Sequence, residues 1–305
     1  QFNFFDPYFT VDGIGIGYGA YYSTSDYSGF NAASYSTDAV GASTQLVLPI
    51  NEIEQLSLSL GLDQTKIKTN IYTSQQLLDY IAAEGATQEA ITVGATWSRN
   101  SLNRGLFPTA GILNLISTSI AIPPSDVTYG KLTHKFRFYT PTLLNLIFSA
   151  RTEIGALFAY GDTEKSPPYQ NFYAGGLNSV RGFKQNTLGP RAYYSSGYSY
   201  ENRSSGGAYL LEGGFDMIFS LPFLEDSRSV RSSIFLDYGN VFSDGCESYE
   251  VRCSEFDLSE LRYSLGVGFT WITALGPMSF AISSPLNNDA FDETETFQFE
   301  IGNQF

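Results

Sequence analysis

The feature that most constrains the fold is an alternation of apolar residues with small or polar ones, sustained for about ten positions at a time. Successive side chains of a β-strand point to opposite faces, so this alternation gives each strand one apolar face and one polar face. In the clearest segment, 262–271, the apolar parity consists of Tyr263, Leu265, Val267, Phe269 and Trp271. Because the period of two recurs along the whole chain, we expect an all-β protein.

Counting these segments predicts about twelve strands, preceded by the stub of an earlier strand at residues 1–5. The predicted strands lie near residues 13–24, 36–48, 54–69, 88–100, 110–121, 127–140, 143–160, 207–220, 229–243, 259–272, 276–285 and 295–305. Strands that cross a membrane at a tilt need about 9–11 residues, whereas soluble strands usually have about five or six. Lipid-facing strands must close or nearly close a ring, because hydrocarbon offers their backbone no hydrogen bonds. We therefore predict a transmembrane antiparallel up-and-down β-barrel, with a soluble β-sandwich as the alternative.

The composition supports a membrane barrel and excludes several other classes of protein. Aromatic residues make up 15% of the chain and charged residues 16%, against about a quarter in soluble domains, which suits strands with aromatic girdles. The net charge of −14 and the lack of any basic run exclude a nucleic-acid partner. No stretch approaches about 18 consecutive apolar residues, so no transmembrane helix is predicted. The acidic cluster of Asp289, Asp292, Glu293 and Glu295 is interpreted as a solvated loop.

The connections between the predicted strands differ greatly in length. Short turns occur at residues 220–222 and 275–277, whereas residues 161–206 form one very long insert. Short turns at one rim and long loops at the other are typical of the periplasmic and extracellular ends of outer-membrane barrels. An insert of this length is usually functional or disordered, and its closely spaced aromatic residues and glycines favour a folded loop. Residues 75–84 are expected to form a short amphipathic helix, with Leu77, Leu78 and Ile81 on one side.

No set of residues in the sequence predicts catalysis, a metal site or a cofactor. No Gly-x-Ser-x-Gly motif occurs, and the sole histidine, His134, falls on an apolar parity where a packing role is expected. Cys246 and Cys253 are the only cysteines, and their close spacing suits a loop disulfide in an oxidising compartment, with a metal site as the less favoured alternative. Arg151 and Glu153 share the inward parity of one strand and are interpreted as a charge pair in the lumen.

The long insert contains the tetrad Val180, Arg181, Gly182 and Phe183, between an Asn-Phe-Tyr-Ala-Gly-Gly run at 171–176 and a Thr-Leu-Gly-Pro run at 187–190. These motifs resemble the BamA family of outer-membrane proteins, in which a Val-Arg-Gly-Phe or Val-Arg-Gly-Tyr tetrad occupies the tip of the sixth extracellular loop. Further matching segments, in the same order, lie at residues 6–13, 107–109, 237–242, 275–277 and 297–305. The resemblance covers essentially the whole chain. The tetrad alone would be weak evidence for it, but several motifs in the same order are strong evidence.

The resemblance implies that this loop folds into the barrel lumen and that Arg181 pairs with acids on the inner wall. The matching positions are Asp216 and Asp237, and the alternation places both on the inward parity of their strands. A guanidinium in a narrow lumen needs such partners, because an unpaired buried charge is costly. Asp216 is a departure, since relatives can carry the longer Glu there, so its contact is expected to be less direct. The alternative is that both are ordinary lumen acids that face water.

The resemblance also implies a weak seam between the first and last strands of the family's barrel. Here the closing strand is 297–305, which carries Phe297, Phe299 and the terminal Phe305, an aromatic end similar to the sorting signal of outer-membrane barrels. Gly302 interrupts the lumen face of this strand, and either loosens the seam or serves simple packing. An incoming strand would pair with the open edge and gain backbone hydrogen bonds that lipid cannot supply.

The function implied by the resemblance is that of a core component of the machinery that folds and inserts β-barrel proteins into the bacterial outer membrane, without ATP or cofactor. Its implied partners are unfolded barrel proteins, accessory assembly lipoproteins, and outer-membrane lipid with lipopolysaccharide. The family's complete barrel has about sixteen strands and follows a set of POTRA repeats. We therefore expect residues 1–305 to be a barrel domain that lacks the POTRA repeats and first strands, and that is inactive alone. The alternatives are a two-partner secretion transporter, which shares the arginine tetrad, and a passive outer-membrane pore.

Overall fold

The described strands form one antiparallel sheet in which neighbours in sequence are neighbours in space. The computed structural model describes residues 1–32, 35–195, 203–221, 229–250, 252–274 and 276–302. Within these residues the sheet has 13 strands, ordered from β1 to β13 without a crossover. The strands are β1 (Phe2–Asp6), β2 (Gly15–Asp26), β3 (Ser36–Asn51), β4 (Glu54–Lys68), β5 (Thr87–Asn100), β6 (Gly111–Ile122), β7 (Tyr129–Pro141), β8 (Ile147–Ala159), β9 (Tyr209–Phe219), β10 (Val230–Phe242), β11 (Arg262–Thr273), β12 (Gly276–Pro285) and β13 (Phe297–Ile301). The helices are α1 (Gln75–Glu84) and the short 3-10 helices η1 (Tyr27–Phe30), η2 (Leu143–Asn145), η3 (Pro168–Gln170) and η5 (Leu258–Glu260).

The predicted antiparallel all-β fold is confirmed. The structure differs from the prediction at the first strand and at the start of β8. The stub at residues 1–5 is a strand in its own right, since β1 pairs with β2 from Phe2 opposite Ala20 to Asp6 opposite Ile16. The predicted strand 143–160 begins only at Ile147, because the backbone before it turns. Leu144 lies there at φ 62°, in the left-handed region, which an extended strand cannot contain.

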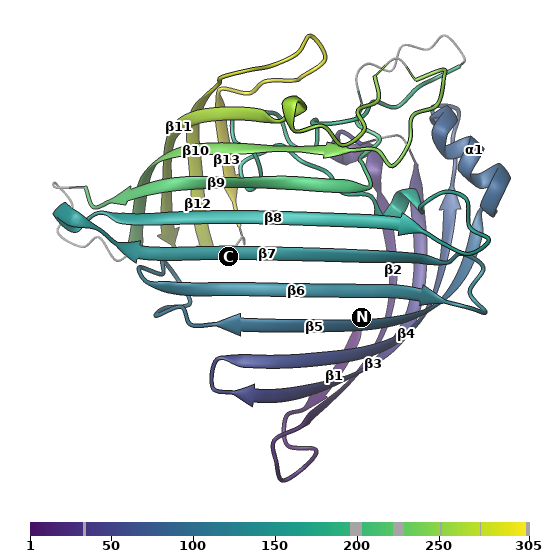
Figure 1. Ribbon diagram of the computed structural model, residues 1–305, viewed down its shortest axis with the longest axis horizontal. Helices are drawn as coiled ribbons and strands as arrows, with labels where there is room; N and C mark the ends of the chain where they lie inside the picture. Colours follow the sequence, from purple (N-terminus) through teal and green to yellow (C-terminus); the bar gives the residue numbers. More distant parts are fainter. Residues whose placement is uncertain (33–34, 196–202, 222–228, 251, 275, 303–305) are drawn as a thin grey trace.

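The sheet is strongly curved, and its two ends turn toward the same side (Figure 1). Strands β5–β9 lie across the front of the view, while β1–β4 and β11–β13 turn away at opposite sides. Within the described residues no ladder joins β1 to β13. The buried core lies between the wall and the connection from β8 to β9, where Val180, Phe183 and Leu188 are each 0% exposed. This connection, residues 160–208, is called the lumenal loop below.

The outer face of the sheet is apolar and its enclosed face is polar, the reverse of a soluble protein. In β11, Leu265, Val267 and Trp271 are between 47% and 49% exposed, whereas Ser264 is 0% exposed and Arg262 is 5% exposed. A soluble sandwich would bury the apolar parity, so this arrangement excludes that alternative. An exposed apolar band around a polar interior is what a barrel in lipid requires.

The two rims differ in the way the sequence predicts. At one rim, residues 52–53 join β3 to β4, whereas the other rim carries α1 and the lumenal loop (Figure 1). Helix α1 has the predicted bounds, and Leu77 and Ile81 of its predicted apolar side pack inward beside Tyr80, whereas Leu78 is 41% exposed. None of the helices in the described part of the chain is long and apolar enough to span a membrane.

The assignment of the outer face to lipid predicts opposite effects for neighbouring residues of β4. Leu60 lies on the outer face, and Ser59 lies on the lumenal face of the same strand. We expect Leu60→Arg to destabilise the protein in lipid by about 2–4 kcal/mol, because a charge at mid-membrane depth faces acyl chains. The matched control, Ser59→Arg, should cost far less because water reaches the lumen. Urea unfolding in bilayers measures both, and equal losses would refute the assignment.

Candidate functional site in the barrel lumen

Arg181 projects from the lumenal loop into the lumen, where two acids of the inner wall hold it. Its Nε donates to Asp237 Oδ2 at 2.6 Å and its Nη2 donates to Asp237 Oδ1 at 2.8 Å, which makes a bidentate pair. Nη2 also donates to Asp216 Oδ1 at 3.1 Å. The Asp237 side chain is 0% exposed and that of Arg181 is 12% exposed, so the pair is shielded from water. We call Arg181, Asp216 and Asp237 the arginine clasp.

An aromatic ring completes the clasp. Arg181 Cζ lies 3.3 Å from the ring centroid of Phe235, an inward residue of β10 that is 1% exposed. A planar guanidinium is attracted to such a ring face. Two glycines of β11 leave the necessary space: a Cβ at Gly266 would lie 2.6 Å from Phe235 Cζ, and one at Gly268 would lie 3.3 Å from Arg181 Nη1. A larger residue at either glycine would crowd the Phe235 ring or the Arg181 guanidinium.

Arg151 of β8 is a second cation on the same carboxylate, with Nη2 2.9 Å from Asp237 Oδ1. Gly214 lies between them in the register, where a Cβ would come within 2.3 Å of Asp237 Oδ1. The predicted pair of Arg151 with Glu153 is wrong, because Glu153 pairs with Lys135, its directly opposite neighbour on β7, at 2.9 Å. Directly opposite residues in a sheet are about 5 Å apart, closer than second neighbours along one strand, which are about 7 Å apart.

The tip of the lumenal loop also bonds to the last strand, through a residue that the predicted seam omits. Gln298 of β13 accepts a hydrogen bond from the backbone N–H of Gly182 at 3.1 Å and donates one to the carbonyl of Phe183 at 2.8 Å. The N–H of Glu295 donates to the carbonyl of Gly182 at 2.9 Å. The loop tip therefore spans the lumen from β10 to β13. The sequence could have identified Gln298 from the alternation alone, because Gln298 occupies an inward position between two aromatic residues of the closing strand.

The acidic segment before β13 is only in part the solvated loop that the sequence predicts, because Glu295 is exposed whereas the Asp292 side chain is buried and paired. The Asp292 side chain is 2% exposed and accepts a hydrogen bond from Arg262 Nε. Glu293 pairs with Lys184 of the lumenal loop at 2.9 Å. Acidic runs are usually solvated, but the cations that neutralise this one lie far away in sequence and reach it only in the fold.

The residues predicted for the seam occupy the end of the sheet. Phe297 and Phe299 lie on the exposed face of β13, which pairs with β12 alone among the described strands. Gly302 has φ 120°, a conformation that favours glycine, and its N–H donates to the carbonyl of Pro277 at 3.0 Å. Gly302 thus follows the last ladder pair and turns the backbone. Phe305 lies outside the described residues.

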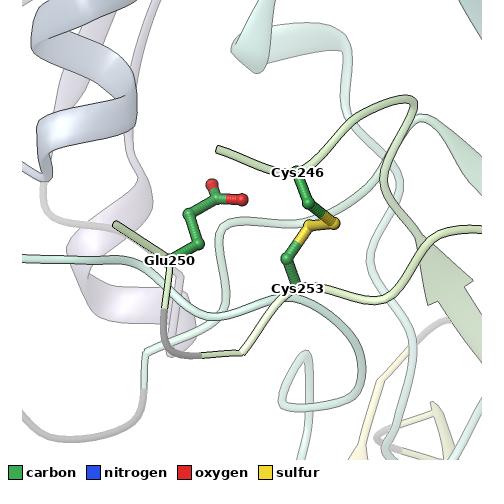
Figure 2. A group of neighbouring side chains, drawn as sticks. All are labelled: Cys246, Glu250 and Cys253. Carbon is green, nitrogen blue, oxygen red and sulfur yellow. A yellow bond between two sulfur atoms is a disulfide. The ribbon is translucent and has the colours of Figure 1, made fainter. Parts of the chain in front are cut away.

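The two cysteines form a disulfide at the rim that carries α1 (Figure 2). The Sγ atoms of Cys246 and Cys253 are 2.05 Å apart, and Glu250 lies close to them. Since a disulfide offers no thiolate, this group lacks the ligands of a zinc site. The disulfide closes a loop that touches α1, because the Tyr249 hydroxyl donates to Asp79 Oδ2 at 2.6 Å.

A family model describes the entire chain, since the Omp85 superfamily domain matches residues 1–305. The chain belongs to the Omp85 superfamily. It is 32% identical over 333 residues to the outer membrane protein assembly factor BamA of Neisseria meningitidis serogroup B, an alignment that covers 99% of this chain and 41% of that protein. The crystal structure of BamA from Haemophilus ducreyi lacking POTRA domains 1–3 matches with a TM-score of 0.87 and 28% identity over 97% of this chain and 60% of that chain.

A further solved structure shares the fold alone. CdiB from Acinetobacter baumannii matches 94% of this chain and 46% of its own with a TM-score of 0.55, at only 13% identity. The resemblance to the BamA family is confirmed, and this Omp85 barrel is an integral protein of the bacterial outer membrane. The chain spans 41% of the length of the curated BamA relative.

The crowding around Asp237 predicts the effect of one added methyl group. Gly214→Ala should weaken the clasp, because its Cβ would collide with the carboxylate that Arg151 and Arg181 share. We expect a loss of about 1–3 kcal/mol in the free energy of unfolding, the usual cost of overpacking. The midpoint of urea unfolding in detergent measures it. Gly29→Ala is the matched control, because a Cβ there meets nothing within 4 Å, and equal midpoints for both variants would contradict the prediction.

The contact between Tyr249 and Asp79 predicts a pH-dependent stabilisation at the rim that carries α1. Burial opposes ionisation of Asp79, but hydrogen bonds from Tyr249 and Gln75 outweigh it and lower the pKa of this carboxyl below its ordinary value. The stabilisation is therefore present above about pH 4 and is lost as the pH falls through the lowered pKa. Tyr249→Phe should cost about 0.5–1 kcal/mol at neutral pH, allowing for solvent screening.

Scanning calorimetry at neutral pH and near pH 3 checks this prediction. The cost of Tyr249→Phe should shrink as the pH falls through the lowered pKa of Asp79, because the carboxyl then takes up a proton and loses its charge. The matched control is Tyr8→Phe, an exposed tyrosine at the opposite rim. A cost that is the same at both pH values would show that the charge of Asp79 is not involved.

Proposed function

We propose that this chain is the membrane-embedded barrel of an outer-membrane assembly factor, whose parent protein folds and inserts other β-barrel proteins. The observation that carries the proposal is the arginine clasp, because the loop tip characteristic of the family is held at once by β10 and by β13. The 32% identity to an outer membrane protein assembly factor supports it. The activity is proposed for the whole protein, because the chain spans 41% of the length of its curated relative.

The proposed chemistry is non-covalent and requires no nucleophile, metal or cofactor. β13 contributes a ladder to β12 through five register pairs, from Ile282 opposite Phe297 to Met278 opposite Ile301. Its outer edge carries backbone N–H and C=O groups that find no partner in lipid. An unfolded barrel protein can present a strand to this edge and gain those hydrogen bonds by strand addition. The lateral seam at β13 is therefore the proposed site of insertion.

The lumenal loop has a structural role in this proposal. Residues 161–206 are the lumen-directed extracellular loop of a single barrel domain, and the tetrad at its tip ties the wall to the closing strand. Breaking a buried ion pair leaves an uncompensated charge, so the clasp holds the loop in one position. The parent protein's proposed partners are unfolded barrel proteins, accessory assembly lipoproteins, and outer-membrane lipid with lipopolysaccharide.

Two alternatives are less well supported. A two-partner secretion transporter also carries the arginine tetrad, but the match to CdiB rests on the fold at 13% identity. A passive pore needs an open lumen, whereas here the loop tip buries Val180, Phe183 and Leu188 inside the sheet. Neither alternative gives a reason for the bonds between the loop tip and β13.

Arg181→Ala tests the proposal in the full-length parent protein. We expect a lower melting temperature and slower folding of an added outer-membrane barrel protein into proteoliposomes, because losing one partner of a buried pair costs about 3–5 kcal/mol. Lys184→Ala is the matched control. It removes a cation from the same loop, but the Lys184 side chain is 45% exposed, so little stability should be lost. Unchanged melting and unchanged folding rates with Arg181→Ala would remove this role of the clasp.

A further inference from the structure

A cavity of about 260 Å³ lies in the lumen between the arginine clasp and the connection from β5 to β6. Four arginines line it: Arg137 of β7, Arg151 of β8, Arg231 of β10 and Arg181 of the lumenal loop. They are four of the chain's 17 basic residues, in a chain whose net charge is −14. Composition does not account for such a concentration of positive charge. We call this space the arginine cavity.

The acids of the clasp neutralise only part of this charge. Asp237 pairs with Arg151 and Arg181, and Asp216 pairs with Arg181. Among the described residues, no carboxylate lies within ion-pair distance of Arg137 or Arg231. Four guanidinium groups therefore face two carboxylates, which leaves a formal charge of 4 − 2 = +2 around the cavity.

The positions of the uncompensated cations favour a bound anion. Arg137 lies directly opposite Arg151 across β7 and β8, and like charges at such positions destabilise a sheet; Asp237 pairs with Arg151 but not with Arg137. Arg231 is held in place by two contacts: its Cζ lies 4.8 Å from the ring centroid of Phe107, and its Nη2 donates to the carbonyl of Pro108. A side chain that is already oriented loses little entropy when it binds a ligand.

We propose that the arginine cavity binds a phosphate group. Guanidinium forks match phosphate oxygens in bidentate geometry, and a phosphate monoester carries about −1.5 to −2 charges at neutral pH, which balances the excess. The volume equals about nine water molecules at roughly 30 Å³ each, so the group fits with part of its hydration shell. This site is separate from the edge of β13 and adds a ligand to the proposed function.

A bound phosphate would connect two parts of the protein that otherwise meet only through the wall. Arg231 is attached to the connection from β5 to β6, and Arg181 belongs to the lumenal loop. A phosphate between them would brace the loop tip from the opposite rim. The phosphate can come from the free inorganic anion or from a lipid headgroup, and both share the same recognition chemistry.

The experiment uses the whole chain in non-ionic detergent, titrated with sodium phosphate against sodium chloride at matched ionic strength. We expect phosphate to raise the melting temperature in a saturable way, because a ligand of the folded state stabilises it. Calorimetric titration with inorganic phosphate should show binding to the unmodified chain that weakens at least about tenfold in Arg137→Gln and Arg231→Gln. Arg99→Gln is the matched control, because Arg99 pairs with Glu54 outside the cavity, and it should bind phosphate as the unmodified chain does.

A second arm identifies the source of the phosphate. The melting temperature is compared in micelles doped with phosphatidic acid and in micelles doped with phosphatidylcholine. If phosphatidic acid raises the melting temperature and free phosphate does not, the phosphate comes from a lipid headgroup. Arg137→Lys keeps the charge and loses the fork, so weaker phosphate binding by this folded variant supports the proposal. Equal stabilisation by chloride, undiminished binding in Arg137→Gln, or no protection from either source would overturn it.

Discussion

The interaction on which the rest of the structure depends is the ion pair of Asp237 with Arg181. Asp237 is 0% exposed, and a carboxylate in such a position is tolerable only when cations and N–H donors surround it. One cation comes from β8 and the other from a loop that must cross the lumen to deliver it. The small residues Gly214, Gly266 and Gly268 follow from this requirement, because a Cβ at any of them would crowd the carboxylate, the guanidinium or the ring beneath it.

The lipid-facing pattern and the lumenal pair are two consequences of one constraint. Strands surrounded by hydrocarbon turn their apolar parity outward, as Leu265 and Val267 do, so the polar parity must face inward. An enclosed polar face needs partners, and here the lumenal loop and side-chain ion pairs supply them for Asp237 and Arg181, while the hydroxyls of Ser264 and Ser283 have no partner among the described residues. The soluble arrangement, with its apolar core inside, would have no use for a buried carboxylate of this kind.

Parity along the chain was sufficient to predict the strands and the inward direction of Asp216 and Asp237, and the amphipathic pattern of residues 75–84 predicted the helix. Parity was not sufficient to predict partners, because partners depend on the register between strands. Glu153 shows this, since it lies opposite Lys135 and not within reach of Arg151. The acidic segment before β13 shows it more strongly, because its cations come from other parts of the chain.

The contacts of β13 indicate where the lumen and the membrane edge are coupled. Within the described residues this strand has five register pairs with a single neighbour, fewer than the ten that join β11 to β12. The two hydrogen bonds of Gln298 to the loop tip therefore form a substantial part of what holds the strand in place. Since the same loop tip is fixed to β10 through Asp237, a strand leaving the edge must either break the bonds of Gln298 or pull on the clasp. The freedom of the edge strand is thus set from inside the lumen, by polar contacts on the face of the sheet opposite the acyl chains.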